Sequence, residues 1–206
     1  MHAAASTWVS RFLPLAAKNN GPVLDLACGS GRHTRLMLDA GYEVWALDKD
    51  ASLLEPLALI GARCFQHDLE ILQGAMDGKA SWPFEANTFS AIIVTNYLYR
   101  PVLSKITESL KDGGILIYET FAAGNEAYGS PRNPDFLLQP GELIEYYLSQ
   151  AMPERKNHCI AYEHGHIVHP RPAVVQRICL RSVSVTSMID TSSDHLDGFE
   201  GIFKRI

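Results

Sequence analysis

The chain has 206 residues and a formal net charge of −5, and 47% of its residues are hydrophobic while 20% are charged. This balance predicts one globular domain with a sizeable core, and it disfavours an electrostatic grip on nucleic acid or on an anionic membrane. No apolar stretch is long enough for a membrane span or a signal peptide, and the cysteines at 28, 64, 159 and 179 form no C-x-x-C pair. We therefore expect a cytoplasmic protein without a disulfide framework, a metal site or a membrane segment.

The N-terminal stretch, residues 3–18, carries Trp8, Phe12 and Leu15 at roughly helical spacing. This spacing predicts a helix that bends at Pro14, because proline lacks a backbone N–H and clashes with the preceding turn. We expect this helix to cover an edge of the sheet or the mouth of a ligand site.

The most informative segment follows directly. Val23 to Leu26 reads as a buried strand with an acid, Asp25, near its end, and a glycine-rich turn comes next at residues 28–31. An amphipathic helix then runs from Arg32 to Gly41, and a second apolar strand, residues 44–47, ends at Asp48. This is a βαβ unit with a ligand-binding turn after its first strand. An acid after the second strand lies where such folds bind the two hydroxyl groups of a ribose.

Two classes of ligand use this geometry. A dinucleotide requires G-x-G-x-x-G, and counting from Gly29 the third glycine falls at Thr34, where it is missing. The carboxylate of Asp25, at the strand end, suits a ligand with a positive amino group better than a pyrophosphate. S-adenosylmethionine has such a group together with a ribose and an adenine. This segment alone leaves open any other nucleotide-binding turn of an α/β protein.

The rest of the chain continues the same alternation. We expect a helix at 51–60, a third short strand at 62–68 that ends at Asp68, a long connection at 70–88 and a buried strand at 89–98. A helix at 101–110, a glycine turn at 113–114 and a strand at 115–119 follow, and then an aperiodic loop at 121–139. Residues 140–150 read as a helix, 154–163 and 172–181 as an antiparallel pair, and 182–206 as an extension of uncertain structure.

Residues 20–120 resemble class I S-adenosylmethionine-dependent methyltransferases, on the acid-x-small-x-Gly-x-Gly string at Asp25–Gly31, the acids Asp48 and Asp68, and the K-D-G-G turn before an apolar strand. The resemblance implies a Rossmann-like α/β fold, with a seven-stranded, mostly parallel sheet closed by an antiparallel strand, over residues 1–181. It implies S-adenosylmethionine as cofactor, and the cofactor-binding residues would be Asp25, Ala27, Cys28, Gly29, Gly31, His33, Asp48, Lys49, Asp68, Leu69 and Asn96.

The acceptor side is less defined. Methyl transfer from a sulfonium needs alignment more than acid–base groups, and no fixed catalytic triad is visible. We expect the catalytic residues to be Asn96 and Tyr97 at the end of the fourth strand, together with Tyr128 and Arg132 in the loop at 121–139. Asn96 could equally cap the strand while Tyr97 packs, and Arg132 could be a solvated loop arginine. The histidines at 158–169 read as part of a polar hairpin.

The resulting hypothesis is a methyltransferase acting on a small-molecule acceptor. The Asn96–Tyr99 stretch lacks the prolines that the resembled family shows at this point in adenine N-methyltransferases, which argues against methylation of a nucleic-acid base. The string Leu26–His33 looks like that of tellurite-resistance and thiol methyltransferases, which favours a soft sulfur, selenium or tellurium nucleophile. The alternatives are an RNA or protein methyltransferase that works with a partner, and a non-catalytic protein that binds S-adenosylmethionine.

Overall fold

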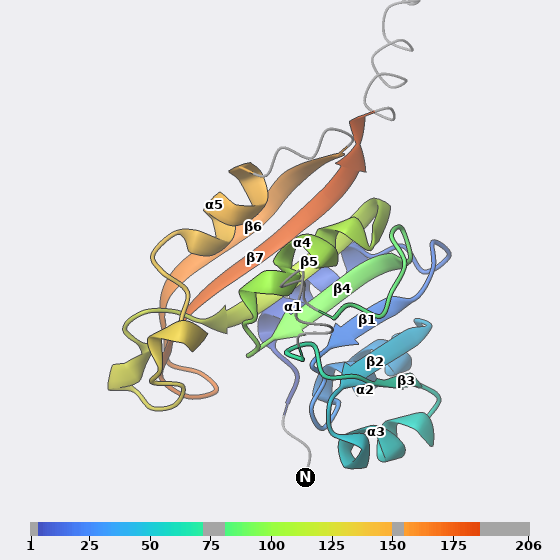
Figure 1. Ribbon diagram of the computed structural model, residues 1–206, viewed down its shortest axis with the longest axis horizontal. Helices are drawn as coiled ribbons and strands as arrows, with labels where there is room; N and C mark the ends of the chain where they lie inside the picture. The colour runs from blue at the N-terminus through green and yellow to red at the C-terminus, as the bar shows by residue number, and fades with distance from the viewer. Residues whose placement is uncertain (1–3, 72–80, 150–154, 186–206) are drawn as a thin grey trace, which may run out of the picture.

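The computed structural model describes residues 4–71, 81–149 and 155–185, and it contains a seven-stranded sheet with helices on both faces (Figure 1). The strand order is β3-β2-β1-β4-β5-β7-β6. Strand β7 runs antiparallel to both of its neighbours, β5 and β6, and the pairings among β1 to β5 are parallel. The predicted Rossmann-like fold is therefore confirmed, including its closing antiparallel strand. The strands are β1 Val23–Leu26, β2 Val44–Asp48, β3 Arg63–Gln66, β4 Phe89–Thr95, β5 Leu110–Phe121, β6 Arg155–Ile167 and β7 Ala173–Ser184.

Strand β1 lies between β2 and β4, and both pairings are parallel. The chain therefore leaves β1 toward one edge of the sheet and later returns to its other side. At such a reversal of strand order, the loops at the carboxyl ends of the strands diverge and leave a crevice for ligands. The turn after β1 and the ends of β2, β4 and β5 all meet at this edge of the sheet.

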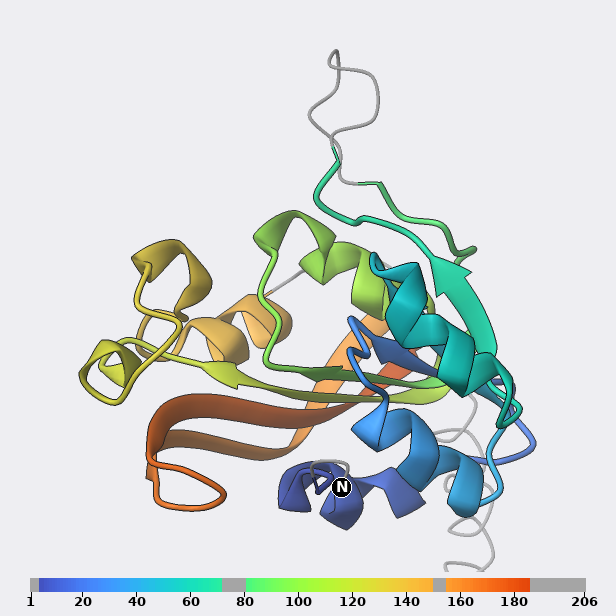
Figure 2. The same ribbon diagram turned by 90° about the horizontal axis from the view of Figure 1, so that it is seen from below.

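The helices form two layers, one on each side of the sheet (Figure 2). Helices α1 (Thr7–Phe12) and α2 (Arg32–Asp39) cover the face to which alternate residues such as Val23 and Ile93 point. The opposite face, with Leu24 and Ile92, packs against α4 (Leu103–Glu108) and α5 (Glu142–Ser149). Helix α3 (Ala51–Ala58) packs on β2 and β3 through Leu54 and Leu57. Because both faces are covered, the central strands β1 and β4 are buried along nearly their whole length.

The N-terminal helix differs from the expectation in length and in place. It ends at Phe12, and a single 3-10 turn, η1 (Leu13–Leu15), follows with Pro14 inside it. Helix α1 packs on a face of the sheet instead of an edge, and the indole N–H of Trp8 donates to the carbonyl oxygen of Ile178 in β7 at 3.4 Å. Its first residues nevertheless reach the carboxyl edge, where Ser6 contacts His33 and Glu119.

Other boundaries shift by a few residues. Strand β5 begins at Leu110 instead of 115, because a register irregularity lets the chain pass the glycine turn without leaving the sheet. The helix expected at 101–110 is split into a 3-10 turn, η2 (Arg100–Val102), and α4. Strand β7 continues to Ser184, so the boundary proposed at 181 falls inside it, and residues 186–206 of the proposed extension lie outside the described residues. No helix in the described ranges is long and apolar enough to cross a membrane.

The loop at 121–139 is held down along its length. It contains two short 3-10 turns, η3 (Asn125–Ala127) and η4 (Pro134–Phe136), and its two ends pair where Ala123 N–H donates to the carbonyl oxygen of Leu138. The buried side chain of Asn125 donates to the carbonyl oxygen of Pro131 and accepts from the N–H of Val174 in β7. The loop is therefore anchored both to itself and to the sheet.

Candidate cofactor and acceptor site

The turn after β1 depends on residues with positive φ. Ala27, Gly29 and Gly31 have φ values of 52°, 54° and 76°. A Cβ on Gly31 would lie 2.3 Å from a Leu57 methyl group, so this position has no room for a side chain, whereas the space beside Gly29 is open. The turn thus packs tightly against α3 at Gly31 and leaves its backbone bare at Gly29, where a ligand can approach closely. Ala27 adopts a conformation that costs a non-glycine residue roughly 1–2 kcal/mol, as ligand-binding turns often do.

Asp48, at the end of β2, holds this turn in place. One carboxylate oxygen accepts from the N–H of Gly29 at 2.8 Å, and the other accepts from the N–H of Asp50 at 3.0 Å. A carboxylate has about four acceptor positions, so these two bonds leave room for two hydroxyl donors. Asp48 therefore shapes the turn and still presents acceptor capacity to a ligand.

Asp25 lies beneath the turn and is 1% exposed. The hydroxyl of Thr34, at the position of the missing third glycine, donates to it at 2.6 Å. Burial raises the pKa of Asp25 to about 7, and the bonds from Thr34 only partly oppose this rise. A cation placed above the turn would favour the charged form of this carboxyl group. The structure thus places the predicted acid behind the turn, and its contact with an ammonium group stays a prediction.

His33, in the first turn of α2, is also buried. Its Nε2 accepts from the backbone N–H of Ser6 at 3.0 Å, so the proton of the neutral ring is on Nδ1, which lies 3.3 Å from the hydroxyl of Thr95. Burial, with the nearby Arg32, lowers the pKa of His33 to about 4. His33 therefore joins the N-terminal segment to the ends of α2 and β4 as a neutral ring, and its predicted contact with the cofactor stays a prediction.

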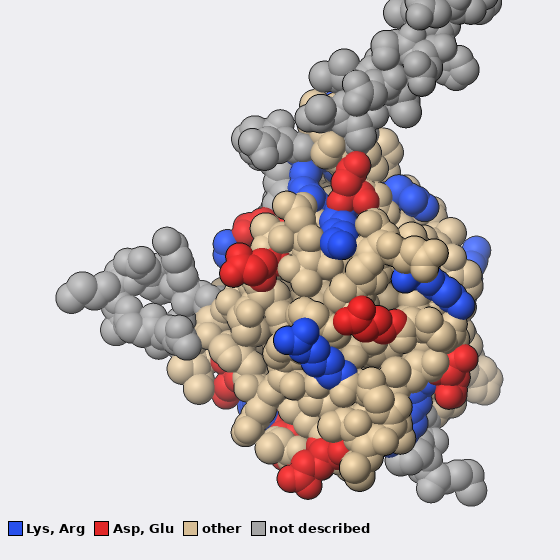
Figure 3. Space-filling model, turned by 90° about the vertical axis from the view of Figure 1, so that its right-hand side faces the viewer, with Lys and Arg blue, Asp and Glu red and all other residues tan. Residues whose placement is uncertain are grey.

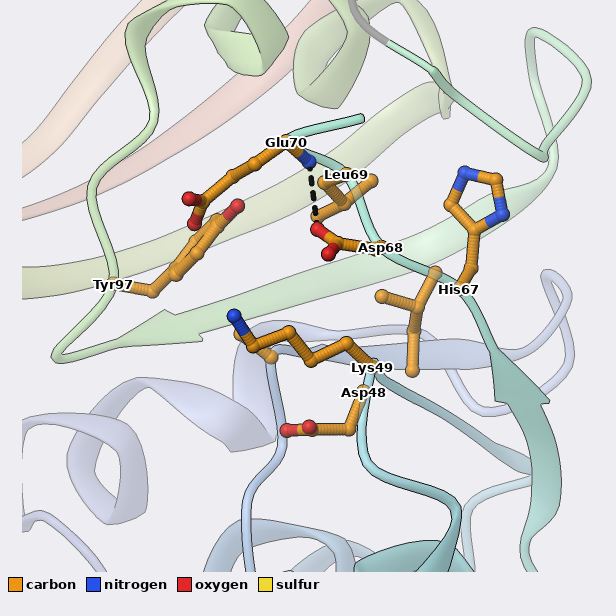
Figure 4. Close-up of a pocket in the computed structure, with 9 residues that line it drawn as sticks. Asp48, Lys49, His67, Asp68, Leu69, Glu70 and Tyr97 are labelled. Atoms are coloured by element: carbon orange, nitrogen blue, oxygen red, sulfur yellow. Dashed lines mark hydrogen bonds between the residues drawn. The ribbon is translucent and has the colours of Figure 1, made fainter. Parts of the chain in front are cut away.

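A cavity of about 230 Å³ opens beside the turn; we name it the β2–β3 cavity (Figure 4). Its lining carries three carboxylates, Asp48, Asp68 and Glu70, against one lysine, Lys49. A pyrophosphate would be repelled by this lining, whereas a cation would be attracted. Leu47, Leu69 and the ring of Tyr97 supply apolar walls of the kind that hold a flat base. The full lining is Ala27, Leu47, Asp48, Lys49, His67, Asp68, Leu69, Glu70 and Tyr97.

Tyr97 and Glu70 lie side by side at one end of this cavity (Figure 4). Burial, followed by the nearby carboxylates Glu70 and Asp68, raises the pKa of Tyr97 well above its ordinary value. The phenol is therefore protonated at neutral pH, and it can donate a hydrogen bond but cannot serve as a base. The position of its backbone is fixed by Tyr118, whose hydroxyl donates to the Tyr97 carbonyl oxygen at 2.9 Å.

Glu70 and Tyr97 also line a second cavity of about 270 Å³, the β4–β5 cavity, so the two cavities adjoin. Asn96 contributes to it from a left-handed conformation, with a φ of 55°, and its N–H is held by the carbonyl oxygen of Glu119. The other lining residues come from the ends of β4 and β5 and from the loop at 121–139, namely Leu98, Thr120, Phe121, Pro131 and Phe136.

Comparison with known proteins shows which proteins this chain resembles. Residues 23–114 match the family model described as a methyltransferase domain. The structure of TehB from Haemophilus influenzae has a TM-score of 0.63 at 17% identity, covering 88% of this chain and 63% of that one. An S-adenosylmethionine-dependent methyltransferase from Mesorhizobium loti has a TM-score of 0.59 at 13% identity, covering 86% and 98%. Residues 23–114 therefore form a methyltransferase domain, on the Rossmann-like fold that these solved methyltransferases share.

Two curated proteins are similar to part of this chain. It is 33% identical over 112 residues to a protein-L-isoaspartate O-methyltransferase of Chlorobaculum parvum, covering 53% of this chain and 48% of the relative. It is 28% identical over 147 residues to a tRNA U34 carboxymethyltransferase of Methylococcus capsulatus, covering 65% and 44%. The chain therefore spans about half the length of the curated relatives that it matches. At these levels of identity, TehB and the other solved structures show the shared fold and not the acceptor.

The methyltransferase domain brings together most of the predicted cofactor residues. Ala27, Asp48, Lys49, Asp68 and Leu69 line the β2–β3 cavity, and Asn96 lies next to it. Cys28 is 8% exposed, and burial raises the pKa of its thiol, so it packs under the turn as a neutral group. Asp68 also accepts from the N–H of Glu70 at 3.0 Å, which positions that glutamate.

Two predicted acceptor residues lie apart from these cavities. Tyr128 is half exposed, and its ring stacks on His166 of β6 with centroids 4.7 Å apart. Arg132 is exposed, and neither residue belongs to the linings described above. Their catalytic role stays a prediction. Glu70, Thr120, Phe121, Pro131 and Phe136 line these cavities although the sequence did not single them out. The last three could have been found from the position of the loop at 121–139 directly after β5.

Proposed function

We propose that this protein transfers a methyl group from S-adenosylmethionine to a small-molecule acceptor. The observation that carries the proposal is the acidic, partly apolar β2–β3 cavity beside a turn that is bare at Gly29. S-adenosylmethionine is a cation with two ribose hydroxyl donors and a flat base, and each of these features has a matching group in the cavity. A dinucleotide would instead place its negative pyrophosphate among three carboxylates.

The roles follow from position. Asp48 would accept the ribose hydroxyls, Asp68 and Leu69 would contact the adenine, and the backbone at Ala27 and Gly29 would face the methionine part. Asp25 would stabilise the ammonium group from below, and its elevated pKa would fall as that positive charge arrives. Arg32, at the start of α2, would face the carboxylate of the methionine.

We place the acceptor in the adjoining β4–β5 cavity. Bound S-adenosylmethionine would supply an activated methyl carbon, which the acceptor's lone pair attacks while the carbon–sulfur bond breaks and its electron pair stays on the departing, neutral sulfur. Asn96 and the protonated hydroxyl of Tyr97 can orient the acceptor by hydrogen bonds. Pro131, Phe136 and Leu98 exclude water from the reacting groups.

The lining favours an acceptor that needs no strong base. Glu70 is the one carboxylate among the residues that line the β4–β5 cavity, and Tyr97 cannot accept a proton at neutral pH. A thiol or another soft nucleophile ionises readily on its own, whereas an alcohol does not. We therefore propose a sulfur, selenium or tellurium acceptor, and we place the reaction in the cytoplasm.

A protein or RNA acceptor is the second candidate, because the two curated relatives are named for protein and tRNA substrates. Two observations weigh against it. The cavity volume of about 270 Å³ is close to the lower limit for small-molecule sites. On the face shown in Figure 3, basic and acidic side chains are interspersed and do not gather into a basic patch that would bind a phosphate backbone.

Two measurements test the proposal. S-adenosylhomocysteine at about 100 times its Kd should stabilise the fold by about 2.7 kcal/mol, which thermal unfolding detects, and NAD at the same concentration should not. Release of S-adenosylhomocysteine would then be measured with thiols, alcohols, amines, RNA and peptides as acceptors. A shift with NAD alone would overturn the cofactor assignment, and turnover with RNA or peptides alone would overturn the small-molecule assignment.

A further inference from the structure

A third cavity, of about 310 Å³, lies at the same edge of the sheet, beyond Asn96 and Phe121; we name it the hairpin cavity. Both of these residues also line the β4–β5 cavity, so the two spaces adjoin. Its walls come from five parts of the chain: the N-terminal segment 4–7, the start of α2, Asn96 after β4, the end of β5 and the β6–β7 hairpin. The proposed function gives roles to Arg32 and Asn96 but assigns no ligand to the rest of this cavity.

The lining of the hairpin cavity is positively charged, although the whole chain carries a net charge of −5. Three arginines, Arg32, Arg171 and Arg177, stand against one carboxylate, Glu119. The remainder is largely small and apolar, with Ala4, Ala5, Ile167, Pro170, Ala173 and Val175 among its members. A cavity that combines apolar walls with an excess of cations over carboxylates favours a partly apolar ligand that ends in an acid group.

The three arginines differ in how they are paired. Arg177 is largely buried and forms an ion pair with Glu119, with Nε and Oε2 2.6 Å apart and side chains 12% and 10% exposed. Its Nη1 also donates to Glu163 at 3.3 Å, and Ser6 donates to Glu119 at 3.1 Å. This network neutralises Arg177 and fixes the floor of the cavity. An added anion would therefore gain little at Arg177.

Of the three arginines in this lining, Arg177 forms ion pairs with carboxylates, whereas no ion pair among the described residues includes Arg32 or Arg171. Arg32 follows the cofactor turn directly, so we expect it to bind the carboxylate of the cofactor and not that of a second ligand. Arg171 lies on the far side, between Pro170 and Pro172, and its guanidinium rests over the ring of Phe121 at 5.6 Å from the centroid. The two prolines restrict the backbone, and the ring of Phe121 contacts the guanidinium. Arg171 would therefore lose little conformational entropy on binding a ligand.

We infer that the hairpin cavity binds a carboxylate group of the methyl acceptor, with Arg171 as the residue that determines this specificity. The inference rests on the proposed function, because it places the acceptor's nucleophile at Asn96 and its acid group at Arg171, both in the lining of one cavity. Arginine recognises carboxylates through paired, charge-assisted hydrogen bonds. The acceptor class is then a small acid that carries a soft nucleophile.

The test uses three thiols of similar size and different charge: 3-mercaptopropionate, 3-mercaptopropanol and cysteamine. Release of S-adenosylhomocysteine by the wild-type protein should be most efficient with the acid. Arg171→Gln should raise the KM for 3-mercaptopropionate about tenfold, with little change for the neutral thiol and in the affinity for S-adenosylhomocysteine. Arg171→Glu should reverse the preference toward cysteamine.

Arg63→Gln is the matched control, because Arg63 is also an exposed arginine over an aromatic ring, 4.4 Å from the centroid of Trp45, and it lines none of the three cavities. Arg63→Gln should leave the KM for all three thiols unchanged. An equal loss with all three thiols in Arg171→Gln, or a loss of cofactor affinity there, would overturn the inference.

A second readout separates this inference from the proposed function. Calorimetric titration of 3-mercaptopropionate into the complex with S-adenosylhomocysteine should give binding to the wild type that Arg171→Gln weakens about tenfold. Such binding without methylation of any thiol would refute the soft-nucleophile proposal and leave the anion site standing. Methylation of the neutral thiol without any preference for the acid would refute the anion site and leave the soft-nucleophile proposal standing.

Discussion

The backbone N–H of Ser6 donates to Nε2 of His33 at 3.0 Å, across 27 positions of the chain. The acceptor must be an unprotonated nitrogen, so this contact exists only while the ring is neutral. The same serine donates through its hydroxyl to Glu119 at the end of β5. Ser6 thus connects the N-terminal segment to both α2 and β5 by hydrogen bonds. The bond to α2 forms only when Nε2 of His33 is unprotonated.

The first prediction concerns pH and stability. The pKa of His33 is lowered from 6.5 to about 4, so between these values the unfolded chain binds a proton that the folded protein does not, and stability rises with pH. The pKa of Asp25 is raised from 3.8 to about 7, so in that window the folded protein holds the extra proton, and stability falls as pH rises. The two effects oppose each other over most of the same range.

Single variants should separate them. In His33→Gln the contribution of Asp25 remains, and the free energy of unfolding should fall more steeply from pH 4 to 7 than in the wild type. In Asp25→Asn the contribution of His33 remains, and the free energy should rise from pH 4 to 6.5 relative to the wild type. Urea unfolding at several pH values measures both slopes, and parallel curves for all three proteins would contradict the assignment.

The second prediction concerns Asp48. Asp48→Ala should lose charge-assisted hydrogen bonds to the ribose worth roughly 1.5–3 kcal/mol, which is about ten- to a hundredfold in affinity for S-adenosylhomocysteine. It should also destabilise the free protein by about 1 kcal/mol for each of the two backbone N–H groups it now accepts from. Asp48→Asn keeps one acceptor oxygen and should lose less of both. Calorimetry and urea unfolding measure the two effects, and unchanged affinity in a folded Asp48→Ala would remove this residue from the site.

The third prediction concerns the anchor of the loop at 121–139. Arg100 binds both carboxylate oxygens of Glu142, at 2.6 and 2.9 Å, and donates to the carbonyl oxygens of Asp135 and Leu137. Arg100→Lys cannot make this set of bonds, so hydrogen exchange at 134–138 should speed up, and the KM for the acceptor should rise as Phe136 shifts. Lys105→Gln, which removes a half-exposed ion pair with Glu108, is the control and should change neither. Cofactor affinity should stay constant in both variants.

The fourth prediction compares residues within that loop. Phe136 lines the β4–β5 cavity, so Phe136→Ala should lower kcat/KM for the acceptor and leave the affinity for S-adenosylhomocysteine unchanged. If Tyr128 and Arg132 act in catalysis as predicted, Tyr128→Ala and Arg132→Ala should also lower turnover. Wild-type rates in these two variants, with a lower kcat/KM in Phe136→Ala, would mean that Phe136 contributes to catalysis and that Tyr128 and Arg132 do not.

Much of the fold could be read from the sequence. The sequence predicts strand β1 at its observed bounds, since a short apolar run between a proline and a glycine turn permits few alternatives. The length of β5 could not be predicted, because whether Asp112 and Gly113 stay in the sheet depends on the neighbouring strand. The helix boundary at Phe12 likewise depends on the packing of Trp8 against β7.

The site residues, too, divide into those that the sequence predicts and those that it does not. Asp48 and Asp68 follow strands whose ends must meet, so sequence order alone brings them to one cavity. Arg171 and Arg177 belong to a hairpin far along the chain, and no local pattern indicates that they face α2. Only the pairing of β7 with β5 brings Arg177 next to Glu119. Tertiary contacts of this kind are not encoded in periodicity.

The position of β7 has a consequence for how the chain is made. This strand is the last of the seven in the sequence, yet it lies between β5 and β6 and pairs with both. Until residues 173–184 have left the ribosome, the β5 edge has no partner, and the hydrogen-bonding groups of Ile115 to Phe121 are open to other strands. A nascent or truncated chain that stops before Ala173 should therefore aggregate or recruit chaperones, and the sheet should close only after synthesis has passed Ser184.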